Sequence, residues 1–400
     1  MVRNIALITL TILYTGMIII IISLYQNNRS QLTSLLYQKF NSSNIISTKS
    51  SQYIWCVNHY GPNNQLKDFI KCCIIAKLNN YTIVIPPLYP HYGRRKTRSI
   101  QWFDEFYDLK QLNLVVNFIT LDQFIAKFKT NKNKVMIDCY IRQAELISNR
   151  MWYPMNTLVS IQNYFKIKID FYRYENISRN LNMNEILNKS KKCSSIFLHI
   201  HYTAFGQYFS SPNIYIQPIF QHLHRTPLIQ RMASQLITLL PNLVVGKNHS
   251  QAKLSKLAVI HMRLGDYNVM SLSNYIQQIL YLINSSAHFT HLHIMCPYLT
   301  STNIKQLTDS LPIAFTTTQH LLNYVRFILD DYLYDVLEQE IAYQAPIFIA
   351  SPWSTYSATV LIQKVYHKKG IVYVSSKKNS SRPLLVTEKK CKIFQIVYFI

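Results

Sequence analysis

A chain of 400 residues, 49% of them hydrophobic, is long enough for two domains with substantial cores. Its formal net charge of +24 raises the question of a nucleic acid or an anionic membrane as partner. The basic residues are scattered rather than clustered and no RNA-binding signature occurs, so no nucleic acid is expected among the partners.

The first apolar run extends from Ile5 to Tyr25 and contains no charged residue. At about 1.5 Å per residue a helix of this length reaches roughly 30 Å, the thickness of a bilayer core. We therefore expect a membrane anchor at residues 1–25, a short cytoplasmic end followed by a transmembrane helix. The rest of the chain would then be lumenal, and a cleaved signal peptide is the alternative. Residues 26–50 are polar and aperiodic and are expected to form a stem.

The globular part begins with a predicted strand at 53–56, a helix at 65–78 and a strand at 81–85, which together form a βαβ unit. Polar residues stand between the first strand and the helix. Ligands in open α/β sheets bind outside the carboxyl ends of strands, so Gly61 and Asn63 are predicted to bind substrate there. Asn64 is a predicted catalytic residue, and Asp68, one helical turn further, is a candidate general base.

Further elements of the first half are predicted as a short helix at 102–112, a helix at 120–128 and a strand at 195–201. Residues 145–195 show no clear pattern. A domain boundary is placed near Thr226 and Pro227, before an apolar helix. This gives an N-terminal, acceptor-side domain at 51–225 and a C-terminal, nucleotide-sugar domain at 226–400.

Strands and helices alternate regularly in the second half. Strands are predicted at 257–262, 291–296, 312–316 and 346–350, and helices at 228–240, 272–283, 301–309, 331–344 and 356–366. Regular alternation predicts a parallel, doubly wound sheet. The expected fold class is therefore α/β, with two Rossmann-like domains facing a cleft.

Two motifs in the second half place polar residues where a strand gives way to a helix. His261, Arg263 and Asp266 follow the first strand, and Ser354, Thr355 and Tyr356 follow the last. A guanidinium gives a bidentate clamp for phosphate oxygens, and hydroxyls and amides at a helix start bind anions. We interpret the two motifs as a nucleotide-sugar site in which Arg263 is catalytic and the other five residues bind substrate.

The sequence contains no Asp-x-Asp pair, so no metal cofactor is expected and Arg263 is predicted to neutralise the leaving diphosphate. Two histidine pairs alternate along predicted strands, His199 with His201 and His291 with His293. We expect these imidazoles to face solvent rather than to bind metal.

Seven cysteines occur, with no C-x-x-C and no zinc-like spacing. In a lumenal protein some of them should pair, although the connectivity cannot be deduced from the sequence. The chain also carries several N-x-S/T sequons, in agreement with entry into the secretory pathway.

Three segments resemble the GDP-fucose protein O-fucosyltransferases, closest to the type that modifies EGF-like repeats. The first contains Asn64-Gln65, Asp68-Phe69 and the strand ending in Pro86-Pro87. The second is the histidine–arginine motif at 261–266, and the third runs from Phe348 to Ala358. The resemblance covers residues 53–130 and 256–365.

The resemblance implies a GT-B fold, GDP-fucose as donor, no metal, and inversion at the sugar. It places Asn64 near donor and acceptor, and His261 and Arg263 on the diphosphate and fucose. It also implies that the phosphate and nucleoside are lined by Ser354, Thr355 and Tyr356. The chain departs from the family at Pro346, where the closest relatives carry an Asp that contacts guanine, and in having no Glu near Gly61.

We therefore predict a membrane-anchored fucosyltransferase of the endoplasmic reticulum or Golgi. It would transfer fucose to a Ser or Thr hydroxyl of a folded protein, such as an EGF-like or other small disulfide-rich domain. Two alternatives remain open. One is a fucosyltransferase with a glycan acceptor. The other is a non-catalytic glycan- or protein-binding descendant of the fold, and the departures from the family at Pro346 and near Gly61 favour it.

Overall fold

The computed structural model describes residues 52–56, 62–88, 101–130, 132–143, 152–177, 183–200, 216–244, 257–264, 270–285, 289–325, 331–352, 354–376 and 382–386. The predicted membrane anchor at 1–25 and the stem at 26–50 lie outside these residues, as do Gly61 and Asp266. Within the described ranges, no helix combines the length and the apolar character needed to cross a bilayer.

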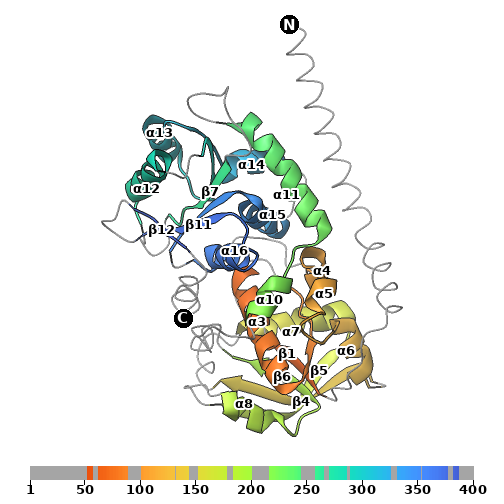
Figure 1. Ribbon diagram of the computed structural model, residues 1–400. Helices are drawn as coiled ribbons and strands as arrows, with labels where there is room; N and C mark the ends of the chain where they lie inside the picture. Colours follow the sequence, from red (N-terminus) through yellow and green to blue (C-terminus); the bar gives the residue numbers. More distant parts are fainter. Residues whose placement is uncertain are drawn as a thin grey trace.

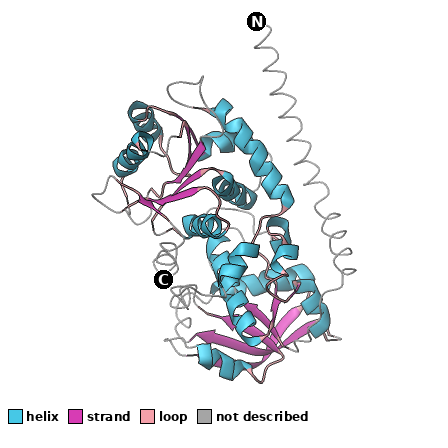
Figure 2. Cartoon of the chain, viewed as in Figure 1, coloured by secondary structure: helices cyan, strands magenta, loops and turns pink. Residues whose placement is uncertain are grey.

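Two six-stranded sheets, one in each half of the chain, form the framework of the molecule (Figures 1 and 2). The first has the order β3-β2-β1-β6-β4-β5, and all its neighbouring strands are parallel. Its strands are β1 (Tyr53–Cys56), β2 (Thr82–Val84), β3 (Phe118–Ile119), β4 (Lys134–Gln143), β5 (Lys168–Ile177) and β6 (Ser195–His199). β1 is buried at all four positions, as expected for a central strand covered on both faces.

Helices follow most strands of the first sheet and pack around it (Figure 2). They are α3 (Pro62–Asn79), α4 (Phe103–Phe106), α5 (Leu109–Leu112), α6 (Leu121–Phe128), α7 (Trp152–Phe165), α8 (Met183–Ser190) and α10 (Ile216–His222). α3 starts three residues before the predicted helix, so Asn63 and Asn64 belong to its first turn.

The second sheet has the order β12-β11-β10-β7-β8-β9 and is parallel except for β12, which pairs antiparallel with β11. Its strands are β7 (Leu257–His261), β8 (His291–Met295), β9 (Ala314–Thr317), β10 (Ile347–Ala350), β11 (Ile371–Val374) and β12 (Leu384–Leu385). The two mostly parallel sheets confirm the predicted α/β class and fit a GT-B-like fold.

Several helices of the second half begin at side-chain caps. Thr226 caps α11 through its hydroxyl and Pro227 occupies the first helical turn, a combination that favours helix initiation. The helices are α11 (Pro227–Leu239), the short 3-10 helix η2 (Leu240–Leu243), α12 (Leu272–Asn284), α13 (Ser301–Ser310), α14 (Thr318–Val325), α15 (Asp331–Gln344) and α16 (Thr355–Tyr366).

The two halves share one hydrophobic core. Helices α3, α10 and α16 contact one another where the halves meet (Figure 1). Phe106 of α4 packs on Tyr332 of α15 with ring centroids 4.6 Å apart. Nearby, the side-chain amide of Gln363 in α16 donates to the carbonyl of Leu223 at 2.8 Å. The halves are therefore held together by buried apolar contact as well as by polar links.

Arg225, in the connection between α10 and α11, is 3% exposed and links the halves. Its guanidinium lies over the ring of Tyr107 in the first half, 4.3 Å from the centroid. It also donates to the side-chain oxygen of Gln339 in α15, and the amide nitrogen of Gln339 donates to Asn63 at the start of α3. One buried cation thus contacts both halves, directly or through one glutamine.

Most predicted elements outside residues 145–195 are present with shifted ends. The helix predicted at 102–112 is two short helices, α4 and α5, separated at Tyr107 and Asp108. The elements that were not predicted include β4, α7, β5 and α8, and also β3, α10, α14, β11 and β12. β5 lies at the edge of its sheet and exposes Tyr172 and Tyr174, so it lacks the continuous apolar run of a central strand.

Two disulfides resolve part of the cysteine pairing that the sequence left open. Cys56 at the end of β1 is bonded to Cys72 in α3, and Cys139 in β4 to Cys193 just before β6. Both bonds lie in the first half. Among the described residues Cys73 and Cys296 are free and buried, and Cys391 lies outside them.

Replacing Arg225 by alanine should destabilise the protein by about 2–3 kcal/mol, because it removes a charged hydrogen bond and a cation–π contact from a buried position. Urea denaturation measures the change. Arg231→Ala, on an exposed position of α11, is the matched control and should change stability by less than about 0.5 kcal/mol. Equal losses in the two variants would contradict the linking role of Arg225.

Candidate functional site

In each sheet the chain winds to one side of its first strand and then crosses to the other. β7 lies between β8 and β10, and β1 lies between β2 and β6, so both are switch points of the winding. Ligands of such sheets bind at the carboxyl ends of strands beside the switch point. The predicted site residues within the described ranges follow these ends: Asn63 and Asn64 after β1, His261 and Arg263 at the exit of β7, and Ser354, Thr355 and Tyr356 after β10.

His261 connects the exit of β7 to the start of α16. Its Nδ1 lies 2.7 Å from the hydroxyl of Ser357, and its ring centroid is 5.0 Å from that of Tyr356, with the planes inclined by 40°. The parallel pairing of β7 with β10 brings these segments together. Two predicted site residues, His261 and Tyr356, are thus in contact.

The environment of His261 keeps its imidazole neutral. Burial, and secondly the positive charge of Arg263, lower the pKa of His261 to about 3. Arg263 follows His261 by two residues at the exit of the same strand. A neutral imidazole beside a guanidinium offers a hydrogen-bond donor and a positive charge to the same anionic group.

The start of α16 adds further donors on the same side of the sheet. The hydroxyl of Ser354 accepts a hydrogen bond from the amide of Ser357 at 3.3 Å and caps the helix. Thr355 and Tyr356 form the first turn, where the helix dipole is positive. The hydroxyl of Tyr356 donates to the carbonyl of Asp335 in α15 at 3.1 Å, which fixes its ring beside His261.

The first turn of α3 contributes two asparagines with different surroundings. Asn63 accepts a hydrogen bond from Gln339, so its side chain joins the two halves. The side-chain oxygen of Asn64 is buried, and no described residue hydrogen bonds with it. An unsatisfied buried carboxamide oxygen is costly, and it is a natural partner for a donor on a bound ligand.

Asp68 is only 3% exposed and lies among two buried lysines of α3. Its Oδ1 is 3.9 Å from Nζ of Lys71. Burial lowers the pKa of Lys71 to about 7 and that of Lys67 to about 8, and in both cases the charge of Asp68 acts in the opposite direction. This setting gives Asp68 a charge-balancing role inside the first half.

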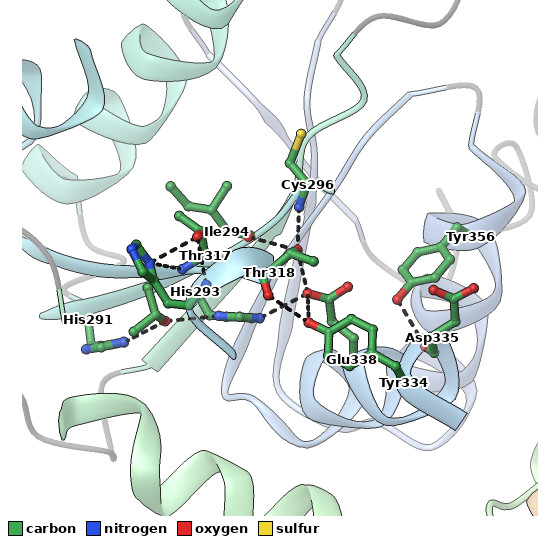
Figure 3. A network of polar contacts seen from close by, with 12 residues as sticks. His291, His293, Ile294, Cys296, Thr317, Thr318, Tyr334, Asp335, Glu338 and Tyr356 are labelled. Atoms are coloured by element: carbon green, nitrogen blue, oxygen red, sulfur yellow. Dashed lines mark hydrogen bonds and ion pairs between the residues drawn. The ribbon is translucent and has the colours of Figure 1, made fainter. Parts of the chain in front are cut away.

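A buried network around Glu338 lies at the carboxyl ends of β8 and β9 (Figure 3). One carboxylate oxygen accepts from the hydroxyls of Thr318 at 2.7 Å and Tyr334 at 3.2 Å, and lies 3.3 Å from Nε2 of His293. Thr318 also accepts from the amide of Cys296 at 2.8 Å. The network therefore locks α15, the helix that positions Tyr356, against the sheet.

The prediction that the strand histidines face solvent is wrong for the three that are described. His199 is 2% exposed, His291 1% and His293 0%. They lie on β6 and β8, which have neighbours on both sides, and one ring nitrogen of each meets the hydroxyl of Tyr140 or Thr316. His201 lies outside the described residues, among which no group of three or more His, Cys, Asp or Glu could hold a metal ion.

Pro346 lies at the amino end of β10, whereas Ser351 follows its carboxyl end. Its carbonyl accepts from the amide of Ile371 at 2.8 Å, as part of the turn into β11. The two ends of a strand lie at opposite edges of a sheet. The proline is therefore remote from the edge that carries His261, and its difference from the family leaves that edge unchanged.

Sequence reasoning gave no role to three residues that hold this edge together, Tyr275, Ser351 and Ser357. Ser351 and Ser357 both lie within the recognised third segment, from Phe348 to Ala358. Tyr275 looks like one more apolar position of α12 and carries no local signal. Its contact with Ser351, at 2.8 Å, exists only once the sheet has formed.

Comparisons with known proteins agree with this architecture. The sequence profile described as GDP-fucose protein O-fucosyltransferase matches residues 53–278. POFUT1 in complex with GDP has a TM-score of 0.56 at 12% identity, covering 82% of this chain and 99% of that one. POFUT1 in complex with GDP-fucose has a TM-score of 0.55 at 13% identity, covering 80% and 96%. No curated protein matches the sequence significantly.

Two mostly parallel sheets with polar residues at both switch points, together with the profile match, define a glycosyltransferase of the GT-B-like kind. The profile covers more than half of the chain, including both Asn64 and the exit of β7. The chain belongs to the GDP-fucose protein O-fucosyltransferase family. The structural likeness to POFUT1 shows the shared fold.

Acid should destabilise the fold through His291. Burial, and secondly His293, lower the pKa of His291 from 6.5 to about 4. Between these values the unfolded chain binds more protons, so stability is present above pH 6.5 and is lost as pH falls toward 4, by at most about 1.4 kcal/mol per pH unit. His291→Gln should flatten the pH dependence of the unfolding free energy in this window, measured by urea titration. An unchanged slope would contradict the assignment.

Proposed function

We propose that this protein transfers fucose from GDP-fucose to a Ser or Thr hydroxyl of a folded protein domain, without a metal and with inversion at the sugar. The observation that carries the proposal is the profile match over residues 53–278, because it includes the asparagine turn of α3 and the exit of β7. The shared fold with POFUT1, which has been solved with GDP-fucose, supports the choice of donor.

The departing GDP is stabilised by positive groups that are in place before the reaction. Negative charge grows on the diphosphate as the bond to the sugar breaks. In the proposal Arg263 holds phosphate oxygens, His261 donates to them as a neutral imidazole, and the first amides of α16 complete the site. The low pKa of His261 supports this assignment, because the imidazole stays a neutral donor at every physiological pH.

Asn64 is proposed to meet the sugar or the incoming hydroxyl. Its buried oxygen has no partner among the described residues, so a ligand hydroxyl would satisfy it. Transfer through an oxocarbenium-like transition state needs only weak assistance from a base. The buried position of Asp68 beside Lys71 is compatible with that limited demand.

The proposed setting is a single-pass membrane protein of the endoplasmic reticulum or Golgi with a lumenal catalytic part. Two observations support it. The apolar run from Ile5 to Tyr25 is long enough for one membrane helix. The bonds Cys56–Cys72 and Cys139–Cys193 are of the kind that persist in an oxidising compartment. The proposed acceptor, a small disulfide-rich domain, would be found in the same compartment.

The direct test is a donor and acceptor panel with the full-length protein in detergent. GDP-fucose, UDP and ADP sugars are offered with EGF-like modules or with N-glycans as acceptors. Fucose on a Ser or Thr of the modules supports the proposal. Transfer only to the glycans would show that the acceptor is a glycan and not a protein hydroxyl. GDP binding without any turnover would identify a non-catalytic descendant of the fold.

Arg263→Ala should lower the transfer rate by about two orders of magnitude or more, since it removes a preorganised charge from the leaving group. Arg263→Lys keeps the charge but loses the fork of donors and should recover only part of the rate. Initial rates at saturating GDP-fucose measure both. A wild-type rate in the alanine variant would show that the site is assigned wrongly.

Removal of divalent cations should leave transfer unchanged, because the sequence offers no Asp-x-Asp pair and Arg263 is assigned the neutralising charge. The measurement is the initial rate in excess EDTA, compared with rates after Mg²⁺ or Mn²⁺ is restored. A rate that collapses in EDTA and returns with one cation would contradict the metal-independent part of the proposal.

A further inference from the structure

His261 and Arg263 are joined by a closed ring of hydrogen bonds through three other residues. The amide of Arg263 donates to the hydroxyl of Tyr275 at 3.2 Å, which lies 2.8 Å from the hydroxyl of Ser351. The amide of Ser351 donates to the hydroxyl of Ser357 at 2.9 Å, and that hydroxyl lies 2.7 Å from Nδ1 of His261. The backbone from 261 to 263 closes the ring.

The three linking residues come from separate segments of the second half and are sealed from water. Tyr275 comes from α12, Ser351 follows β10, and Ser357 lies in α16. All three residues are 0% exposed. A polar group without water is held firmly by its few partners, and loss of one leaves the next unsatisfied.

The hydrogen positions follow from counting donors and acceptors. The hydroxyl of Ser351 reaches the carbonyl of Pro352 at 3.5 Å, so its hydrogen has an acceptor and the Tyr275 hydroxyl donates to its oxygen. The oxygen of Ser357 accepts from the amide of Ser351. The hydrogen of Ser357 then has one acceptor among the described residues, Nδ1 of His261.

The tautomer of His261 follows from this direction. Since Nδ1 accepts from Ser357, the imidazole carries its proton on Nε2. No described residue accepts a hydrogen bond from Nε2. His261 therefore presents an N–H donor that is ready for an anionic oxygen, and the amide held by Tyr275 fixes the backbone that carries Arg263.

We propose that Tyr275, Ser351 and Ser357 are positioning residues for transfer, which fix the Nε2–H tautomer of His261 and the backbone of Arg263 against the leaving diphosphate. This inference rests on the proposed function, because it gives these residues their purpose in that reaction. It adds two specific consequences: loss of the Ser357 hydroxyl shifts the tautomer of His261, and loss of the Tyr275 hydroxyl lowers the affinity for the nucleotide.

The first experiment compares two tyrosines. Tyr275→Phe removes the hydroxyl bonded to Ser351, and Tyr81→Phe removes another buried hydroxyl, which lies 2.7 Å from Ser190 in the first half. Both variants should lower the melting temperature to a similar extent. GDP affinity, measured by calorimetry on the full-length protein, should fall about tenfold in Tyr275→Phe only.

The second experiment measures the tautomer without relying on activity. Long-range proton–nitrogen NMR of labelled histidines, with His261 assigned by its loss in His261→Asn, should show an unprotonated Nδ1 in the wild type. Ser357→Ala should move that nitrogen toward a tautomer mixture. Ser357→Thr, which restores a hydroxyl, should recover the wild-type signal.

The outcomes separate this inference from the proposed function. One outcome is that the wild type binds no GDP while the Nδ1 signal of His261 still changes in Ser357→Ala and recovers in Ser357→Thr. In that case the assignment of GDP-fucose as donor fails, whereas the role of the ring in positioning His261 is retained. If Tyr275→Phe keeps wild-type GDP affinity, or matches Tyr81→Phe, the positioning role is overturned. A protonated Nδ1 in the wild type, or an unchanged signal in Ser357→Ala, overturns the tautomer.

Discussion

The parallel pairing of β7 with β10 is the constraint on which the site depends. Ile260 pairs with Ile349, so His261 leaves the sheet beside Ala350 and meets the chain that continues into α16. The ladder of backbone hydrogen bonds sets this register, and buried apolar residues on both strands leave little freedom to slip. Through this one pairing, residues nearly a hundred positions apart come into contact and form the two sides of the proposed anion site.

Helix α15 connects this part of the second sheet to the first half of the chain. Asp335 and Gln339 lie one helical turn apart and therefore on one face. The carbonyl of Asp335 accepts a hydrogen bond from the hydroxyl of Tyr356. The side chain of Gln339 accepts one from Arg225 and donates one to Asn63. The buried carboxylate of Glu338, on the same helix, bonds Thr318 and lies beside His293, which fixes the helix against the sheet. The separation between the asparagine turn and the exit of β7 is thus determined by one rigid helix.

The sequence predicted β7 to β10 of the second sheet but only β1, β2 and β6 of the first, for a physical reason. Central strands such as β7 and β10 are short apolar runs, whereas the edge strand β5 exposes two tyrosines and looks like a loop. His293 was misread because a strand interior accepts a polar ring when Thr316 satisfies it. The exit of β7 and the start of α16 were recognised from local motifs. Ser357 and Arg225 acquired roles only from tertiary contacts, which no local pattern encodes.

The proposed reaction depends on an arrangement in which a guanidinium, a neutral imidazole and a helix start meet the diphosphate of the donor. A crystal structure of the protein with GDP, grown in the presence of a chelator, tests this most directly. It is predicted to show the diphosphate between Arg263 and the first turn of α16, with Nε2 of His261 on a phosphate oxygen. A nucleotide bound elsewhere, or an Arg263 side chain turned away from the phosphates, would contradict it.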